Sequence, residues 1–278
     1  MRALALGLGM IALLGPAVAG AEARLVTLGG SVTEIAVALG AEDRLVARDS
    51  TSTYPDTITD LPDVGYIRAL SPEGVLSVSP DMILAEAGAG PVEAVEVLRA
   101  AGVPFLTIPN DPTPEGVLAK IDAVAAHLGV DGAPLRDSVA AGLVAARDRA
   151  AGLDTRKRVL FILSLQGGRV LAGGAGSSAE GIIALAGGVN AATGFEGYKQ
   201  MTDEAVLQAA PDVILMMDRE GDLAIADAEV LAHPALAQTP AAAAGAILRM
   251  DGLLLLGFGP RTPAAADQLF ARLYPGRG

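Results

Sequence analysis

One phrase occurs twice in this chain of 278 residues, and the repeat constrains the fold more than any other feature. Residues 73–84 read EGVLSVSPDMIL and residues 204–215 read EAVLQAAPDVIL, with Glu, Val, Leu, Pro, Asp, Ile and Leu in register. Each copy predicts a short helix, a Pro-Asp turn and a buried strand. A Gly-Tyr pair precedes each copy, at residues 65–66 and 197–198. We therefore expect two similar lobes with a ligand cleft where they face each other.

Short apolar runs alternate with helix-like patterns along both halves of the chain. In the first half, residues 24–28, 44–47, 82–84 and 104–108 predict strands, and residues 32–39, 92–101 and 114–128 predict helices. The second half continues through residues 158–163, 181–186, 213–217, 231–237 and 246–249 to a last helix at 263–273. Ser31 and Glu34 fit a capping box that opens the first helix at Val32. The alternation in the first half predicts a parallel α/β lobe, and the whole pattern predicts an α/β fold with two similar Rossmann-like lobes.

A single long helix is expected between the lobes. Pro134 suits a first helical turn, apolar residues recur at Leu135, Val139 and Leu143, and Gly152 is a suitable stop. The expected segments are a signal peptide at 1–21, an N-terminal lobe at 22–132, the interlobe helix at 133–153 and a C-terminal lobe at 154–278. No Gly- or Ser-rich linker occurs at this point in the sequence, so we expect a stiff connection and a small closing motion.

The N-terminus indicates export. Arg2 is followed by the apolar run 3–14 and by small residues at 17–21, which is typical of a secretory signal peptide cleaved after Ala19 or Ala21. No other segment of the sequence approaches the roughly 20 apolar residues that a membrane span needs. The chain has no cysteine, hence no disulfide and no lipid-modified cysteine. A bacterial periplasm fits best, and the net charge of −12 argues against a nucleic-acid partner.

Three further segments resemble one known family. Residues 51–55 (TSTYP), 63–74 (DVGYIRALSPEG) and 251–263 (DGLLLLGFGPRTP) are similar to the periplasmic haemin-binding proteins of bacterial haem ABC importers. The resemblance covers nearly the whole mature chain, although siderophore and cobalamin receptors share the two-lobed architecture. It implies haem as the transported ligand, no catalytic cofactor, and a monomer whose contact with the membrane is limited to an ABC permease.

The resemblance implies that the phenolate oxygen of Tyr66 is the axial ligand of ferric haem. Tyrosine is one of the recognised haem ligands. Because a free phenol has a pKa of about 10, ligation at neutral pH needs help from the iron and from a nearby cation. Arg68 lies two residues further on, so it would share one side of an extended segment with Tyr66. The alternative is a packed Tyr66 ring beside a solvated Arg68.

Three other residues are candidates for the walls of the cleft. Tyr198 occupies in the second lobe the place that Tyr66 has in the first, and it could be a second wall or a weaker ligand. Lys199 could bind a haem propionate, because a carboxylate favours a cationic partner. The alternative for this pair is a packed aromatic ring beside a surface lysine. Tyr54 could line the cleft or simply pack.

Histidine is the usual rival ligand, and the chain has two. His127 falls on the predicted helix 114–128, and His233 precedes Pro234 at the start of a helix; both are expected to be structural. Some relatives are expected to add a histidine to the haem from the second lobe, but residues 167–188 contain none. This departure favours one tyrosine ligand with an open or water-filled sixth position. Without a His/Asp/Glu cluster, a zinc or manganese receptor is disfavoured.

Glu73 and Glu204 open the two repeated helices. A carboxylate there is favourable because of the helix dipole alone. The resemblance implies a further role, in which one acidic residue on each lobe docks against arginines of the permease, and the acidic net charge would assist the encounter with a basic surface.

Other function classes are less well supported. Residues 174–179 (GAGSSA) fit a dinucleotide fingerprint, with Glu196 about 20 residues beyond, which would suit a periplasmic oxidoreductase. The preceding strand is too far away, however, and a tight loop before a helix at 178–186 is the favoured interpretation. No G-x-S-x-G elbow occurs in the sequence, so a hydrolase is not indicated. We expect a binding protein and not an enzyme, with a siderophore or cobalamin receptor as the main alternative.

Overall fold

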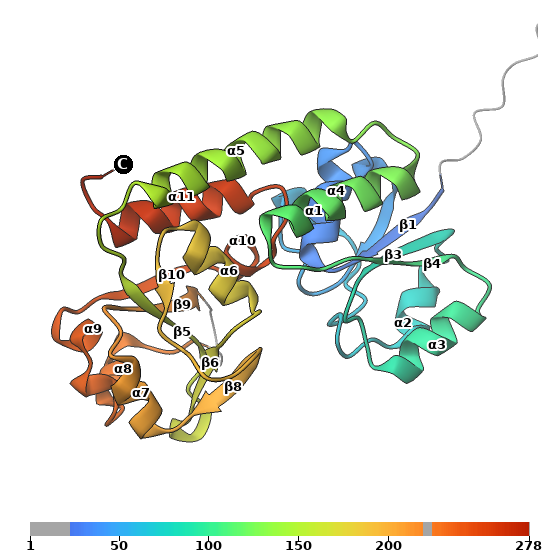
Figure 1. The fold of residues 1–278 in the computed structure, drawn as a ribbon. Helices are drawn as coiled ribbons and strands as arrows, with labels where there is room; N and C mark the ends of the chain where they lie inside the picture. Colours follow the sequence, from blue (N-terminus) through green and yellow to red (C-terminus); the bar gives the residue numbers. More distant parts are fainter. Residues whose placement is uncertain (1–22, 219–223, 278) are drawn as a thin grey trace, which may run out of the picture.

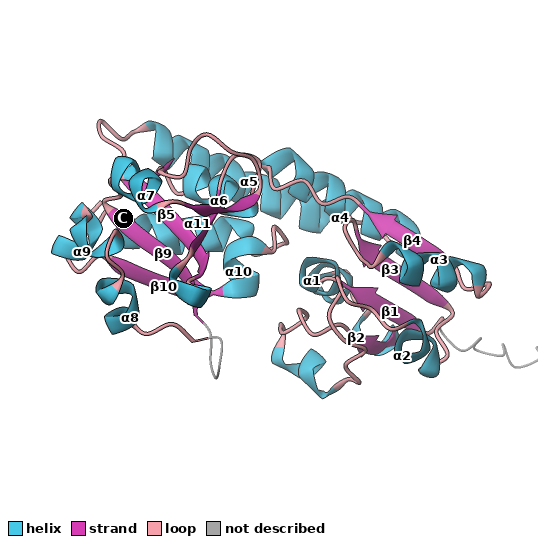
Figure 2. Cartoon of the chain, turned by 90° about the horizontal axis from the view of Figure 1, so that it is seen from below, coloured by secondary structure: helices cyan, strands magenta, loops and turns pink. Residues whose placement is uncertain are grey.

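The computed structural model describes residues 23–218 and 224–277. The predicted signal peptide at 1–21 lies outside the described residues. Two lobes stand side by side beneath a long helix, and each lobe has its own sheet (Figures 1 and 2). Within the described ranges, no helix combines the length and the apolar character that crossing a membrane requires.

The first lobe is built on a four-stranded parallel sheet in the order β2-β1-β3-β4, as the alternation predicts. Its strands are β1 (Leu25–Leu28), β2 (Leu45–Arg48), β3 (Met82–Glu86) and β4 (Phe105–Ile108). Its helices are α1 (Gly30–Ala38), α2 (Pro72–Ser77), α3 (Val92–Ala100) and α4 (Pro114–Leu128), with short turns of 3-10 helix at η1 (Glu42–Arg44) and η2 (Asp56–Asp60).

The second lobe has a mixed sheet in the order β10-β9-β5-β6-β8. β5 (Arg158–Ser164) pairs in parallel with β9 (Val213–Asp218) and with the short β7 (Val189–Asn190), and β9 pairs in parallel with β10 (Ile247–Asp251). On the side away from β9, β5 pairs with β7 at its start and antiparallel with β6 (Val170–Gly173) further along, and β6 pairs antiparallel with β8 (Tyr198–Met201). The second lobe thus differs from the parallel first lobe in that two short antiparallel strands, β6 and β8, extend its sheet.

The helices of the second lobe are α6 (Ser178–Leu185), α7 (Asp203–Ala209), α8 (Asp227–Ala232), α9 (Pro240–Ala243), α10 (Gly252–Leu256) and α11 (Thr262–Leu273). The helix expected at 231–237 is interrupted: α8 ends at Ala232, and a short 3-10 turn, η5 (Leu236–Gln238), follows. Pro234 explains the break, because proline disfavours helical geometry in the residue before it and lacks a backbone N–H.

The sequence repeat forms equivalent structural units in the two lobes. In the first, the Arg24 N–H donates to the carboxylate of Asp81 (2.8 Å) and the Asp81 N–H returns a bond to the Arg24 carbonyl (2.8 Å). In the second, Arg158 and Asp212 form the same reciprocal pair, again at 2.8 Å in each direction. The Pro-Asp turn thus fixes the start of the repeated strand to the first strand of each lobe.

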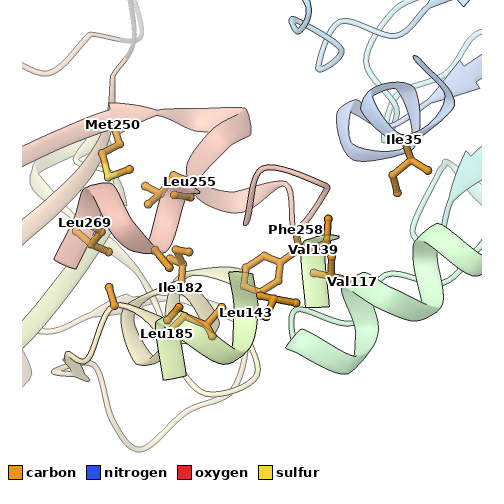
Figure 3. Packing of buried hydrophobic residues seen from close by; sticks show 14 of the residues in the cluster. Ile35, Val117, Val139, Leu143, Ile182, Leu185, Met250, Leu255, Phe258 and Leu269 are labelled. Carbon is orange, nitrogen blue, oxygen red and sulfur yellow. The ribbon is translucent and has the colours of Figure 1, made fainter. Parts of the chain in front are cut away.

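The helix α5 (Ala133–Ala151) joins the lobes and spans about 28 Å at 1.5 Å per residue. It packs on α4 of the first lobe and on α11 and α6 of the second. Val139 and Leu143 on its inner face belong to one buried apolar cluster that includes residues of both lobes. Figure 3 shows Phe258 and Ile182 of the second lobe among these side chains. The prediction of one long helix between the lobes is therefore confirmed, and the lobes also share a core.

The start of α1 differs from the expected capping box. The helix begins at Gly30, and its N-cap is Gly29, which forms no side-chain cap. Ser31 and Glu34 are consequently inside the helix, and their side chains bind elsewhere. The Ser31 hydroxyl donates to Glu86 (2.5 Å), and the Glu34 carboxylate pairs with Arg261 of the second lobe.

Candidate ligand-binding site

The Tyr66 side chain is presented by a firmly held turn between η2 and α2. Gly65 adopts a φ of 99°, which favours glycine, and its carbonyl accepts a hydrogen bond from Ser50 N–H (3.0 Å). On the other side, the buried Ile67 accepts one from Gly90 N–H (2.9 Å) through its carbonyl. Between these anchors the Tyr66 side chain is 44% exposed. A phenol on a fixed backbone is therefore available to a ligand.

Tyr198 lies at the start of β8 and is mostly buried. Its ring meets Phe161 edge-on, with centroids 6.3 Å apart. Burial raises the pKa of Tyr198 above its ordinary value, and this effect exceeds the opposing influence of hydrogen bonds to the Ala179 backbone and the Ser178 side chain. The charge of Arg68 also opposes the rise in the Tyr198 pKa. An arginine of the first lobe is thus within electrostatic reach of a tyrosine of the second.

The two tyrosines therefore differ in exposure. Tyr198 is mostly buried, keeps its proton at neutral pH, and has its hydroxyl already engaged at the start of α6. Tyr66 is 44% exposed and precedes Arg68, the cationic residue that acts on Tyr198, by two positions in the sequence.

The raised pKa of Tyr198 predicts a pH dependence of stability. The unfolded chain loses this proton near pH 10, earlier than the folded chain does, so the free energy of unfolding falls as pH rises from about 10 toward the raised value. Tyr198→Phe should remove the fall in the free energy of unfolding that comes from this residue. It should also remove the increase in tyrosinate absorbance that Tyr198 contributes above pH 10. An ultraviolet absorbance titration of the native and Tyr198→Phe proteins checks this prediction. If the absorbance increase that is lost in Tyr198→Phe is centred at the ordinary tyrosine pKa of about 10, the prediction is contradicted.

Lys199 does not share a side of β8 with Tyr198. Adjacent residues of a strand point to opposite faces of a sheet, and in the β6–β8 ladder Tyr198 is opposite Gly173 while Lys199 is opposite Ala172. Lys199 is exposed, whereas Tyr198 packs toward α6. Tyr198 and Lys199 thus lie on opposite faces of the sheet.

Tyr54 has a partner that the sequence did not indicate. The Arg261 guanidinium lies 3.6 Å from the centroid of the Tyr54 ring, a cation–π contact. Two of the three guanidinium nitrogens of Arg261, Nη2 and Nε, also donate to the Glu34 carboxylate, at 2.5 and 3.1 Å. Tyr54 remains 43% exposed, so one face of the ring is covered by Arg261 and the rest is accessible. The sequence signal that could have singled out Arg261 is its place in the segment 251–263, which carries the family resemblance.

Lys120 is a further residue that sequence reasoning missed. It is fully buried in α4, and its ammonium group donates to Ser31 (2.8 Å), Asn110 (3.0 Å), Glu86 (3.3 Å) and the Gly257 carbonyl of the second lobe (3.2 Å). Burial lowers the pKa of Lys120, and the Glu86 carboxylate acts in the opposite sense. The contact to Gly257 makes this cluster a bridge between the lobes.

The two histidines are structural or peripheral. His233 is buried, its Nε2 lies 3.0 Å from the Gly168 carbonyl, and its Nδ1 accepts from Ala235 N–H (3.3 Å). His127 is exposed in the last turn of α4. Across residues 23–218 and 224–277, no group of three or more His, Cys, Asp or Glu side chains is arranged to hold a metal ion.

The glycine-rich loop at 174–177 serves α6. Ser177 caps this helix by accepting from Glu180 N–H (3.2 Å), and the Glu180 carboxylate accepts from Gly176 N–H (2.7 Å). The preceding strand β6 is antiparallel to its neighbours, so the loop is not the turn of a dinucleotide-binding βαβ unit. A cavity of about 660 Å³ lies behind this loop, between α5, α6 and residues 111–114, and neither Tyr66 nor Tyr198 lines it.

Glu73 and Glu204 occupy matching places. Each is the second residue of a short helix, α2 or α7, whose N-cap is Ser71 or Thr202, and both carboxylates are exposed. The pKa of Glu204 is lowered by its own backbone N–H and by Thr202. The capping geometry is thus present in both copies, and the carboxylates remain accessible.

Comparison with known proteins agrees with this fold. Residues 25–253 match the periplasmic binding protein family, and the chain belongs to this family. It is 42% identical to the periplasmic heme-binding protein BhuT solved with two hemes, covering 90% of this chain and 97% of that one with a TM-score of 0.85. It is also 37% identical to apo RhuT from Roseiflexus sp. RS-1, a periplasmic heme-binding protein, over 92% of this chain and 99% of that one (TM-score 0.87).

A second set of relatives is named for a different ligand, vitamin B12. The chain is 35% identical to the vitamin B12-binding protein of Yersinia pestis over 108 residues, which is 39% of this chain and 36% of that protein. The match thus spans about a third of the length of these curated relatives. Periplasmic heme-binding protein HutB of Vibrio cholerae is similar over more of its length, with 34% identity across 91% of this chain and 99% of that one (TM-score 0.80).

Proposed function

We propose that this protein captures haem in the periplasm through Tyr66 and delivers it to an ABC permease for import. The observation that carries the proposal is the exposed Tyr66 phenol on an anchored turn, with Arg68 reaching electrostatically toward Tyr198 of the other lobe. The names of BhuT, RhuT and HutB, which are similar over nearly their whole length, support haem as the ligand.

Each of these side chains would have a separate role in binding haem. Ferric iron is a Lewis acid that displaces the phenol proton, and Arg68 stabilises the resulting phenolate of Tyr66. Tyr198 stays protonated and offers an aromatic wall. Tyr54 contributes the accessible part of its ring. Lys199, on the far face of β8, would reach a propionate only at the edge of the ligand.

This function involves no catalytic step, and haem is cargo rather than a resident cofactor. The sixth iron position is open or water-filled, because neither histidine is available to it: His233 is bonded to backbone groups, and His127 is at the end of α4. We further propose that the chain works as an exported monomer after removal of residues 1–21.

Cobalamin is the second candidate, favoured by the partial match to vitamin B12-binding proteins. Titrating the mature protein with haemin, cyanocobalamin and a ferric siderophore separates the candidates. Saturable binding of haemin, with a Soret band and charge-transfer features, supports the proposal. Binding of cyanocobalamin or the siderophore with no saturable haemin binding overturns it.

Glu73 and Glu204 would dock the two lobes on the permease. Because both carboxylates are exposed in the first turns of α2 and α7, Glu73→Gln with Glu204→Gln should leave haemin affinity unchanged. Association with the permease in nanodiscs should slow by on the order of tenfold or more at low salt.

Glu93→Gln with Glu229→Gln provides a matched control for this double variant, since these are exposed acids in the first turns of α3 in the first lobe and α8 in the second. Equal association rates for the double variant and for the control would contradict the docking role.

A further inference from the structure

One segment of the second lobe is seated against the first lobe. Residues 257–261, between α10 and α11, approach α1 so closely that a Cβ added at Gly259 would lie 3.3 Å from the Ser31 Cβ. Phe258 adopts a φ of 50° and is 1% exposed, so this backbone is held by its packing (Figure 3). We call this segment, together with Glu34 and Lys120, the interlobe joint.

Two charged anchors hold the interlobe joint. Lys120, on the first lobe, donates to the Gly257 carbonyl while Glu86 balances its charge. Arg261 forms a two-nitrogen fork with Glu34, whose side chain is only 5% exposed. A bidentate fork fixes direction as well as distance, and a buried charge that loses its partner is costly. The joint therefore has one geometry in which all of its charges are paired.

The interlobe joint is connected to the ligand side of the molecule. Arg261 stacks on the Tyr54 ring at 3.6 Å. Four residues before Tyr54, the Ser50 N–H is bonded to the Gly65 carbonyl, next to Tyr66. A displacement of Arg261 relative to Glu34 would therefore also displace residues 50–54, which hold the Tyr66 turn through the bond from Ser50 to Gly65.

We propose that Lys120, Glu34 and Arg261 are positioning residues that set the spacing between Tyr66 on one lobe and Tyr198 on the other before any ligand arrives. The proposal rests on the proposed function for its consequence in ligand binding, but the spacing itself is a property of the free protein. The shared core beneath α5 brings the lobes together, and the interlobe joint selects their relative orientation.

Distances between spin labels test this directly, because the chain has no native cysteine. Val97→Cys on α3 and Leu231→Cys on α8 place nitroxides on exposed sites of opposite lobes. The otherwise native protein should give one narrow distance distribution without ligand. Arg261→Met should broaden it. Arg136→Met, which breaks an exposed ion pair between α5 and α4, is the control and should leave it narrow.

Haemin affinity provides the second readout. If only about a tenth of the Arg261→Met molecules keep the native spacing, the apparent Kd rises about tenfold while the visible spectrum of the bound form is unchanged. A narrow, unshifted distribution in Arg261→Met would overturn the proposal, as would a broadened one with unaltered haemin affinity.

Glu34→Gln repeats the test if Arg261→Met does not fold. Should the native protein bind no haemin, the proposed function fails separately, and the distance measurement still decides whether these residues set the lobe spacing.

Discussion

Tyr66→Phe should abolish the phenolate-type visible spectrum of the ferric haem complex. The substitution removes the only oxygen of this side chain and leaves the ring, the Gly65 and Ile67 anchors and the fold intact. Because loss of an outer-sphere partner of a metal ligand already costs about 10–100-fold in affinity, losing the ligand itself should weaken haemin binding on the order of a hundredfold or more. Haemin titrations followed by visible absorption measure both effects.

Tyr54→Phe is a closely matched control for Tyr66→Phe. Its side chain is 43% exposed against 44% for Tyr66, and a phenylalanine ring preserves the stacking with Arg261. The Tyr54→Phe protein should keep the native spectrum. Unchanged haemin binding and spectrum in Tyr66→Phe would transfer the axial role to Tyr198 or Tyr54.

Lys120→Met should lower the free energy of unfolding by about 3–5 kcal/mol, the usual cost of removing one partner of a buried ion pair. Methionine fills the space but leaves Glu86, Ser31, Asn110 and the Gly257 carbonyl without their ammonium donor. Urea denaturation measures the change through the transition midpoint.

Loss of an exposed ion pair provides the control for the effect of Lys120→Met on stability. Arg136→Met removes the contact between α5 and Asp122, which lies on α4 as Lys120 does; both side chains are at least 41% exposed, and the loss should cost less than about 1 kcal/mol. A Lys120→Met protein as stable as the native one would mean that the buried cluster contributes nothing net to folding.

Local sequence patterns were sufficient for most of the fold. The parallel strands of the first lobe are short and mostly apolar, which made them recognisable, and the ends of α4 match the expected 114–128. The repeat was informative because Pro-Asp forms the same turn twice, anchored by Arg24 in one lobe and Arg158 in the other. Residues separated by a few positions determine such features.

The features that the sequence did not predict depend on contacts between residues that are distant in sequence. β6 and β8 are short strands whose pairing depends on neighbours in space, so Tyr198 was not expected on a strand. Ser31 and Glu34 match a capping box in spacing, yet partners more than 50 residues away take their side chains. Lys120 falls at helical spacing with the buried Val117 and Val124, and this position was an unused signal that it lies inside.

Binding of the haem iron by the Tyr66 phenolate can be observed by resonance Raman spectroscopy of the haemin complex, excited in the phenolate-to-iron charge-transfer band, when the protein carries ring-deuterated tyrosine. We expect enhanced phenolate modes that shift on deuteration and are absent in Tyr66→Phe. A haemin complex without deuterium-sensitive phenolate modes, or with the same modes in Tyr66→Phe, would contradict this expectation.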